Sequence, residues 1–342
     1  MSLQSRLDVI QGKWVYVWRV SNIFGGDVPK IIQALQHADV TGIALKVHNG
    51  SYKWDDPELF QVKEFVDACF EAGIYVIFWG YIYLKWNPLG EARAAAEMVK
   101  QYWPKVLAYM IDAEAHAKWQ RVAAKIFARD LQKRIGSLVP IGLNSYRFPS
   151  LHQELPWKAL RSPCMFDCPQ VYYRWGSPSH NLYKSFDEFS RLYPKLPFIP
   201  AGDMYAEHGY ATTPAQVKEF LSAVESDPSM PAAIMWTMDQ IERLPHLWQT
   251  FAEFEWPVDG QPPNPTPPPV PMPTPTEQPL WPAATKAKWL RVRSGPGMFH
   301  RTVRYLPKGD RADVYQVEGN WARITPCDKT ARWVGKRWLV KI

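Results

Sequence analysis

The chain has 342 residues, of which 46% are hydrophobic and 14% aromatic, and these fractions exclude a disordered or fibrous protein. The length allows one large core or two domains. The formal net charge of +7 is unevenly distributed, because residues 284–342 carry +10 whereas residues 1–283 carry −3. The basic C-terminal part therefore predicts an anionic partner, such as nucleic acid, anionic lipid or an anionic wall polymer.

The N-terminal residues 1–12 are polar and mixed, without the apolar core of a signal peptide. No run of 18 apolar residues predicts a membrane span. Cys69, Cys164, Cys168 and Cys327 show no C-x-x-C spacing and no surrounding His cluster. We therefore expect reduced thiols, and predict no metal site, no disulfide framework and no cofactor.

Apolar runs and amphipathic stretches alternate along residues 1–256. We expect buried strands at residues 14–20, 42–47, 74–83, 106–111, 139–143, 165–173, 198–201 and 232–237. Helices are expected between most of them, for example at residues 56–72, 90–102, 120–135 and 213–225. Apolar strands separated by helices are typical of a parallel sheet buried on both faces. Eight such units in roughly 245 residues predict an α/β fold, a closed (β/α)8 TIM-type barrel.

Two further segments follow the expected barrel. Residues 257–283 contain 12 prolines between Pro257 and Pro282, which predicts a semi-rigid polyproline II linker. In residues 284–342, short strand-like runs at 289–293, 312–317, 321–324, 333–334 and 338–342 predict a small all-β barrel. The expected domains are thus residues 1–256 and 284–342, joined by the linker 257–283.

In a (β/α)8 barrel the reactive groups lie where the strands end. The residues at the expected strand ends are rich in aromatic rings and hydrogen-bonding groups. We expect substrate-binding side chains at Lys46, Trp79, Tyr81, Asn144, Tyr146, Gln170, Tyr172, Asp203, Trp236 and Asp239. The aromatic members of this set are equally consistent with barrel packing, and the two aspartates with structural caps.

The end of the fourth expected strand carries Asp112 and Glu114. Residues two apart in a strand point to the same face, about 6.6 Å apart along the chain, so both carboxyl groups should lie in the barrel mouth. Glycoside hydrolysis needs one carboxylic acid and one carboxylate. Two alternatives stay open: a solvated D-x-E at a loop entrance, and a metal site with His116. A second histidine is not nearby, which disfavours the metal site.

The sequence GIALKVHNG at residues 42–50, followed by residues 56, 57 and 60, resembles the second-strand signature of glycoside hydrolase family 25, the lysozyme-like muramidases. Tyr81, the D-x-E run and Trp236 occur in a similar order, so the resemblance extends over residues 13–254. It implies that Glu114 is the general acid and Asp112 its partner carboxylate. Asp112 would act through the 2-acetamido group of the substrate or directly as a nucleophile.

The chain departs from the family 25 pattern at two places. The first expected strand ends without the aspartate that is usual there, and Asn49 stands where the family more often has glutamate. Asp203 or Asp239 could supply the missing carboxylate. The chitinase-like family 18 fits the sequence less well, because its longer acidic run would need aspartate at Leu107 and Met110.

The sequence WLRVRSGPG at residues 289–297 and the later Gly319-Asn320-Trp321 resemble a bacterial SH3-like domain, over nearly all of residues 284–342. The resemblance implies binding to the peptide part of peptidoglycan, and the +10 charge favours anionic wall polymers. Nucleic acid is the less favoured partner because no ribonucleoprotein signature accompanies the basic residues. A spacer or dimerisation module is the alternative.

The expected barrel, the linker and the basic C-terminal domain together predict a peptidoglycan-degrading muramidase of the endolysin type. In such a protein the basic domain concentrates the barrel at its polymeric substrate. Without a signal peptide, we expect action at the bacterial cell wall after release from the cytoplasm at phage lysis. The alternative is a protein that is not an enzyme: a barrel without catalytic activity that serves as a wall-binding or phage structural protein.

Overall fold

A computed structural model of the chain describes all residues except 57–59, 208, 257–278, 298–299, 301 and 326–331. The chain divides into two compact units, Met1–Asp259 (the barrel unit) and Gly260–Ile342 (the C-terminal unit). Most of the expected proline-rich linker, and Cys327, lie outside the described residues.

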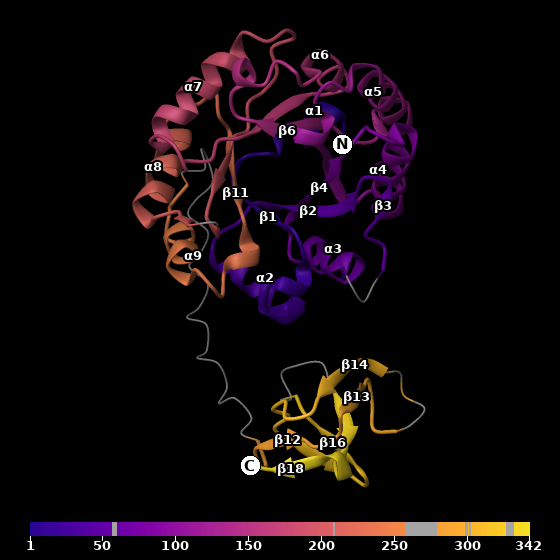
Figure 1. The fold of residues 1–342 in the computed structure, drawn as a ribbon. Helices are drawn as coiled ribbons and strands as arrows, with labels where there is room; N and C mark the ends of the chain where they lie inside the picture. The colour runs from indigo at the N-terminus through magenta and orange to yellow at the C-terminus, as the bar shows by residue number, and fades with distance from the viewer. Residues whose placement is uncertain (57–59, 208, 257–278, 298–299, 301, 326–331) are drawn as a thin grey trace. The chain divides into compact units, whose positions relative to one another are not determined.

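Eight parallel strands form a closed barrel in the barrel unit (Figure 1). They are β1 (Gly12–Val17), β2 (Gly42–Asn49), β4 (Tyr75–Ile82), β5 (Val106–Ala113), β6 (Ile141–Tyr146), β7 (Phe166–Gln170), β8 (Ala201–Asp203) and β11 (Ala232–Trp236). β1 pairs in parallel with both β2 and β11, which closes the sheet. The TIM-type fold predicted from the alternating apolar runs is therefore confirmed.

One expected strand differs clearly from the observed one. The seventh barrel strand, β8, spans Ala201–Asp203, whereas the apolar run predicts residues 198–201. Phe198 forms only an isolated bridge with Asp167. Pro197 and Pro200 flank this part of the run, and proline has no N–H to donate to a sheet ladder, so regular pairing begins only after Pro200.

The helices surround the strands in the ribbon view (Figure 1). They are α2 (Val28–His37), α3 (Val62–Glu71), α4 (Pro88–Tyr102), α5 (Arg121–Ile135), α6 (Trp157–Leu160), α7 (Pro178–Ser190), α8 (Pro214–Glu225) and α9 (Pro245–Ala252). Short connections add β3 (Tyr52–Lys53), β9 (Ala206–Glu207), β10 (Tyr210–Ala211) and the 3-10 turns η1 (Val20–Asn22), η2 (Phe24–Gly26), η3 (Ala115–Ala117), η4 (Pro149–Leu151) and η5 (Met238–Gln240). Side-chain caps and an early proline fix the starts of several helices; at α8, Thr213 and Gln216 form a capping box.

Alternate residues of the strands supply two buried cores. In β1, Val15 and Val17 pack outward in the core shared with the helices, whereas Trp14 and Tyr16 belong to the core inside the barrel. Helix α1 (Leu3–Asp8) lies inside the ring of helices in Figure 1, and its Leu7 joins the inner core. The Nη1 atom of Arg6 donates a 2.9 Å hydrogen bond to the carbonyl of Val106, where β5 begins. Helix α1 therefore covers the N-terminal end of the barrel and leaves the C-terminal end to the loops.

The C-terminal unit consists of antiparallel sheets. Its strands are β12 (Ala283–Thr285), β13 (Trp289–Arg293), β14 (Thr302–Pro307), β15 (Gln316–Glu318), β16 (Trp321–Arg323), β17 (Trp333–Gly335) and β18 (Leu339–Lys341), with the 3-10 turn η6 (Lys336–Trp338) before the last. Five of them are ordered β14-β13-β17-β16-β15, and β12 pairs with β18. Leu290, Val292, Leu306, Val314 and Val334 form a small core. The all-β prediction is confirmed, although β14 was not among the expected strands.

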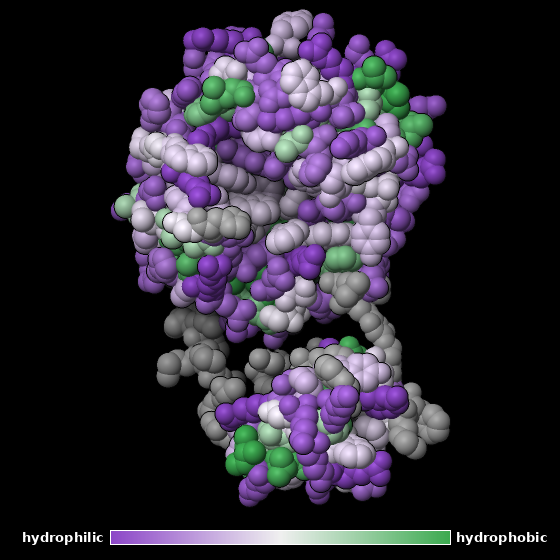
Figure 2. Space-filling model, in the orientation of Figure 1, coloured by the Kyte–Doolittle hydropathy of each residue, from purple (hydrophilic) through white to green (hydrophobic). Residues whose placement is uncertain are grey.

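The faces visible in the space-filling view are mostly hydrophilic, with hydrophobic side chains in small separate groups (Figure 2). In the described parts of the chain, no helix combines the length and the apolar character needed to cross a bilayer.

Candidate active site

The C-terminal ends of the barrel strands bring the predicted site residues together. Asp112 lies near the end of β5 and Glu114 directly follows that strand. Their neighbours in the ladder come from the flanking strands: Tyr81 of β4 and Asn144 of β6 are both in register with Asp112. Lys46 lies on β2, Gln170 ends β7, and Asp203 and Trp236 end β8 and β11.

Gln170 bridges the two carboxyl groups. Its Nε2 donates a 2.8 Å hydrogen bond to Oε1 of Glu114 and lies 3.4 Å from Oδ1 of Asp112. Asp112 is buried, whereas Glu114 is half-buried. Burial raises the pKa of Asp112 well above its ordinary value; the nearby Glu114 carboxyl raises it further, and Lys46 opposes the rise. The pair is therefore suited to carry one proton and one negative charge between its two members.

Four aromatic rings surround the ammonium of Lys46. Its Nζ lies 4.9 Å from the centre of the Trp79 ring, 5.1 Å from Trp54, 5.8 Å from Trp18 and 5.9 Å from Tyr81. Such distances allow cation–π attraction with each ring. Neither Trp18 nor Trp54 is among the predicted substrate-binding residues: Trp18 stands at the end of the first expected strand but was not selected, and Trp54 lies beyond the expected strand ends.

The floor of the mouth is an aromatic and amide network inside the barrel. The Nδ2 atom of Asn144 donates to the hydroxyl of Tyr16, which also lies 3.4 Å from Sγ of Cys168. The Tyr16 ring packs edge-on against Trp79 and Trp236, with centroid separations of 5.7 and 5.5 Å. Trp79 is buried and donates to the carbonyl of Ala44, so it packs the barrel; Trp236 is half-buried beside it.

The side-chain oxygen of Asn144 differs from the other polar atoms of this network. In the described part of the chain, its buried Oδ1 has no hydrogen-bond partner. A buried amide oxygen without a donor is costly, so water or a ligand group is expected to supply one.

Tyrosines line the mouth on either side of Glu114. Tyr81 shares a 2.7 Å hydrogen bond between its hydroxyl and Nδ1 of His116. Tyr172 packs against the Tyr205 ring at 5.9 Å, and burial together with the negative charges of Glu114 and Asp112 raises its pKa well above the ordinary value. These tyrosines therefore stay neutral and can donate hydrogen bonds to a ligand.

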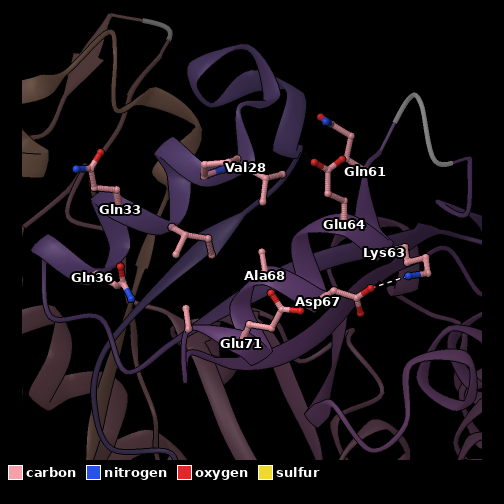
Figure 3. Close-up of a pocket in the computed structure, with 12 residues that line it drawn as sticks. Val28, Gln33, Gln36, Gln61, Lys63, Glu64, Asp67, Ala68 and Glu71 are labelled. Atoms are coloured by element: carbon pink, nitrogen blue, oxygen red, sulfur yellow. Dashed lines mark hydrogen bonds and ion pairs between the residues drawn. The ribbon is translucent and has the colours of Figure 1, made fainter. Parts of the chain in front are cut away.

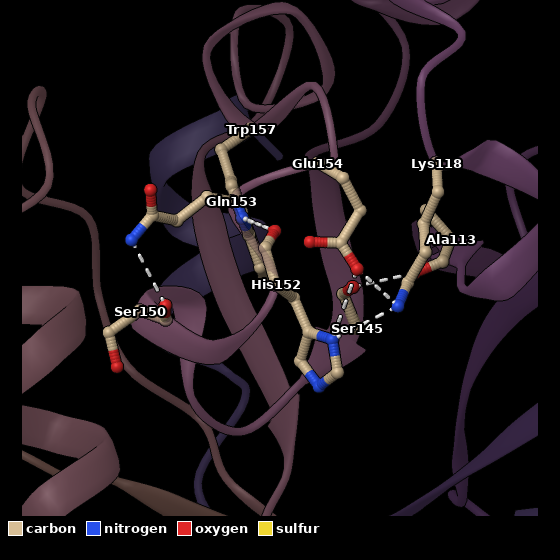
Figure 4. Close-up of polar contacts among 8 residues, drawn as sticks. All are labelled: Ala113, Lys118, Ser145, Ser150, His152, Gln153, Glu154 and Trp157. Atoms are coloured by element: carbon tan, nitrogen blue, oxygen red, sulfur yellow. Dashed lines mark hydrogen bonds and ion pairs between the residues drawn. The ribbon is translucent and has the colours of Figure 1, made fainter.

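Figure 4 shows a polar cluster that joins the loops after β5 and β6. Two of its residues, His152 and Lys118, also lie against Tyr146. The Tyr146 ring stacks on His152 at 3.7 Å, and the Nζ atom of Lys118 lies 5.0 Å from the ring centre. Lys118 forms a 2.5 Å ion pair with Glu154 and lies 3.2 Å from Nδ1 of His152. The Ser145 hydroxyl donates to the carbonyl of Ala113, which ties β6 to the end of β5.

Asp239 lies against the end of β1, where the family 25 pattern has its missing aspartate. Its carboxylate accepts hydrogen bonds from the backbone N–H groups of Trp18 and Arg19 at 2.7 and 2.9 Å, from Nδ2 of Asn22 at 3.2 Å and from the Thr237 hydroxyl at 2.8 Å. Both oxygens are thus occupied by donors of the protein itself.

Asp203 is fully buried at the end of β8. Its oxygens accept from the Tyr173 N–H, the Thr212 hydroxyl and the Tyr210 hydroxyl, at 3.2, 3.0 and 3.3 Å. Burial nevertheless raises the pKa of Asp203 to about 7. The residue links β8 to the small hairpin of β9 and β10.

The alternative of a metal site finds no support in the geometry. In the regions that the structure describes, no three or more His, Cys, Asp or Glu side chains are grouped so that they could hold a metal ion. His116 hydrogen-bonds to Tyr81 instead. Of the described cysteines, Cys69, Cys164 and Cys168 are free and buried.

Exposed tryptophans follow three of the barrel strands. Trp86 after β4, Trp119 after β5 and Trp175 after β7 are 73%, 73% and 70% exposed. Flat apolar rings with a polar edge are suited to stacking on sugars. Sequence reasoning missed these residues because it considered only the strand ends, although each Trp stands in the loop that directly follows an expected strand.

A separate open groove of about 740 Å³ lies on the outside of the barrel, between α2 and α3 (Figure 3). Its walls include Val28, Ile32 and Ala68, with Glu64, Asp67 and Glu71 along one side. None of the strand-end residues lines it. Asp67 in the groove is paired with Lys63 and Lys105. The mouth of the barrel, which holds the Asp112–Glu114 pair, therefore remains the candidate active site.

Residues 289–340 match the family model of the bacterial SH3 domain. No curated protein sequence matches the chain.

Solved structures with a similar fold include enzymes that act on polysaccharides. A Streptomyces coelicolor protein described as a chitinase A has a TM-score of 0.52 at 12% identity, over 71% of this chain and 98% of that one. The chitinase from Chromobacterium violaceum has a TM-score of 0.50 at 9% identity, over 70% and 98%. The spore cortex-lytic enzyme SleL of Bacillus cereus also has a TM-score of 0.50 at 9% identity, over 70% and 73%.

At such low identity these structures establish the fold of the barrel unit and nothing finer. The specific likeness to family 25 muramidases stays a prediction. The chain thus combines a TIM-type barrel, of the kind found in glycoside hydrolases, with a C-terminal bacterial SH3 domain.

Proposed function

We propose that the protein is a glycoside hydrolase that cuts bacterial cell-wall polysaccharide. The observation that carries the proposal is the Asp112–Glu114 pair, bridged by Gln170 in a mouth lined with aromatic rings. A carboxylic acid beside a carboxylate is the group that glycosidic bond cleavage requires. The wall polymer as substrate class is supported by the bacterial SH3 domain, and the fold is shared with a spore cortex-lytic enzyme of Bacillus cereus.

Glu114 is the general acid in this proposal. It is half-buried and therefore accessible, and its proton passes to the glycosidic oxygen as the bond from that oxygen to the anomeric carbon breaks. Asp112, deeper in the mouth, holds the shared proton in the resting pair because burial raises its pKa; it passes this proton to Glu114 and then carries the negative charge that stabilises the positive sugar ring. Water then adds to the anomeric carbon and returns a proton to Glu114. Asp112 acts through the 2-acetamido group of the sugar or as a direct nucleophile.

The C-terminal unit would hold the enzyme at the wall. Its match to the bacterial SH3 domain and the charge of +10 on residues 284–342 support binding to peptidoglycan and to anionic wall polymers. Such binding should weaken steeply with added salt if the basic residues carry the affinity. Release at phage lysis is the setting that we propose for an enzyme of this architecture.

Digestion of purified peptidoglycan tests the proposal. New reducing ends, identified by mass spectrometry, are expected for the full chain and not for Glu114→Gln. A chain that sediments with walls but releases no sugar would instead support the non-enzymatic wall-binding alternative.

The division of labour between the units has its own test. A version that ends at Trp256 should still cut soluble wall fragments but bind intact walls poorly, because each unit has its own core. Equal wall binding by this version and by the full chain would show that the C-terminal unit is a spacer.

A further inference from the structure

The ammonium of Lys46 is an unusual group in the barrel mouth. The side chain is only 8% exposed, and in the described regions of the chain Nζ makes no hydrogen bond or ion pair. Aromatic rings from three separate segments enclose it: Trp18 after β1, Trp54 after β3, and Trp79 and Tyr81 on β4. Burying a charge at such a place is costly unless an opposite charge compensates it.

The compensating charge comes from β5. The two groups that favour the charged form of Lys46 are Asp112 and Glu114, in that order, while burial lowers the pKa of the ammonium. In return, Lys46 is the group that opposes the upward pKa shift of Asp112. The geometry agrees with this coupling: Tyr81, whose ring centre lies 5.9 Å from Nζ of Lys46, is in register with Asp112 on the neighbouring strand β5. The cation and the two carboxyl groups therefore interact across β4, from β2 to β5.

We propose that Lys46 is a positioning residue whose ammonium keeps the Asp112–Glu114 pair in the form with one proton and one negative charge. This inference rests on the proposed function, in which Glu114 must be protonated while Asp112 is ionised. With Lys46 charged, the three groups together are neutral in that form. Without it, a lone negative charge would remain in a low-dielectric site, and the pair would take up a second proton. The four rings cover much of the ammonium and reduce its contact with water, which strengthens its effect on the pair.

The other titratable groups around the pair do not supply this charge. Those that face it are Tyr16 on β1, Tyr81 on β4, Tyr146 on β6, Cys168 on β7 and Tyr172 after β7. Burial raises the pKa of each of them, so they are neutral at neutral pH. His48, two residues from Lys46 on the same strand, is neutral as well because burial lowers its pKa to about 4.

Two further groups stand at the edge of the site. The exposed His116 hydrogen-bonds to Tyr81, which is in register with Asp112. The exposed Arg19 is the other cation, with its guanidinium 5.2 Å from the Trp18 ring and 5.7 Å from the Trp54 ring. Arg19 shares two of the rings that enclose Lys46, so it offers a matched control for the removal of a cation.

Carboxyl titration by NMR tests the inference in the full-length protein. With ¹³C-labelled aspartate and glutamate, and with Asp112→Asn to assign the signals, the titration of the pair is compared between wild type and Lys46→Met. Methionine fills the same apolar cage without charge. The apparent pKa values of the pair should rise by about one pH unit or more in Lys46→Met. In Arg19→Met they should rise by less than about 0.3 unit, because an exposed cation is screened.

Lys46→Arg should restore the wild-type titration, because it keeps the charge. Thermal unfolding reports whether each variant folds, and Lys46→Gln replaces the methionine variant if that one does not. A titration in Lys46→Met or Lys46→Gln that coincides with wild type would overturn the inference.

The pH profile of kcat/KM on wall fragments gives a second readout. Both of its limbs should move to higher pH in Lys46→Met, since loss of the cation makes both ionisations of the pair harder. A higher KM with an unmoved profile would make Lys46 a substrate-binding residue and overturn the inference. If the wild type releases no sugar while the carboxyl titration shifts as expected, the proposed function fails and the role of Lys46 in the charge of the pair stands.

Discussion

Acidic side chains lie at or just beyond the C-terminal ends of two barrel strands, β5 and β11. Their hydrogen-bond partners differ sharply. Beyond β11, Asp239 accepts from four donors of the protein, two of them backbone N–H groups. At the end of β5, Asp112 and Glu114 share a single nitrogen donor, the Nε2 atom of Gln170, among the residues described. A carboxylate with every lone pair occupied holds the fold together. A pair short of donors keeps a proton and stays available for a ligand.

Location at a strand end therefore does not by itself identify a catalytic acid. The sequence pattern predicts a site role for all three residues, because each follows an apolar run. The structure separates them by the number of hydrogen-bond donors that each carboxyl group has, and substitutions at each residue test this difference.

The largest effect is expected at Glu114. Glu114→Gln keeps the shape of the side chain and its contact with Gln170 but removes the proton that the leaving oxygen needs. The rate of wall lysis should fall at least about a hundredfold, the usual size of a general-acid effect. Turbidity of purified walls measures the loss, and an unchanged melting temperature shows that the fold is intact. Asp112→Asn should be similarly damaging. Near-normal lysis by Glu114→Gln would refute its assignment as the acid.

Asp239→Asn should act on stability. In the variant an NH₂ group replaces one of the two carboxylate oxygens, so donors that bind an oxygen in the wild type face another donor. The free energy of unfolding should therefore fall by about 2 kcal/mol, as for a broken buried hydrogen-bond network. Urea unfolding measures this loss. Asp187→Asn is the matched control, because its ion pair with Arg191 is exposed and should contribute at most about 1 kcal/mol. A hundredfold loss of lysis in Asp239→Asn with unchanged stability would place Asp239 in the catalytic group.

Gln170→Leu tests the shared donor. Loss of one hydrogen bond to an ionised group should lower kcat/KM near neutral pH by about tenfold and move the acid limb of the profile upward. Gln153→Leu is the control, since this exposed amide donates to the Ser150 carbonyl in the loop after β6 and not to the carboxyl pair. Equal activities of the two variants would show that Gln170 does not tune the pair.

Local sequence patterns were sufficient to predict the barrel and the pair. Apolar strands alternating with amphipathic helices indicated the closed sheet, and a spacing of two residues placed Asp112 and Glu114 on one face. The late start of β8 could also have been predicted from Pro197 and Pro200. These features depend only on residues close together in the chain.

The partners of the acidic groups could not be predicted in this way. Gln170 reaches Glu114 across 56 positions of sequence, and the Trp18 N–H reaches Asp239 across 221. The rings around Lys46 come from β4 and from the connections after β1 and β3. Which donors and rings meet at the mouth is decided by closure of the barrel, and no periodicity within one strand contains that information.

Asp203 lies between the two extremes and gives the smallest predicted effect. It has three donors, yet burial raises its pKa to about 7, above the value of about 3.9 for an unfolded aspartate. Between these two values the folded state binds more protons than the unfolded state, so ionisation of Asp203 lowers the free energy of unfolding as the pH rises. Urea unfolding at pH 5 and at pH 6 measures the free energy of unfolding of wild type and of Asp203→Asn. The value for wild type minus the value for the variant should fall by about 1 kcal/mol from pH 5 to pH 6, because Asn does not titrate. A difference that stays constant would mean that Asp203 is already ionised at pH 5. Its three donors would then suffice to hold the charge, and Asp203 would belong with Asp239 among the carboxylates that stabilise the fold.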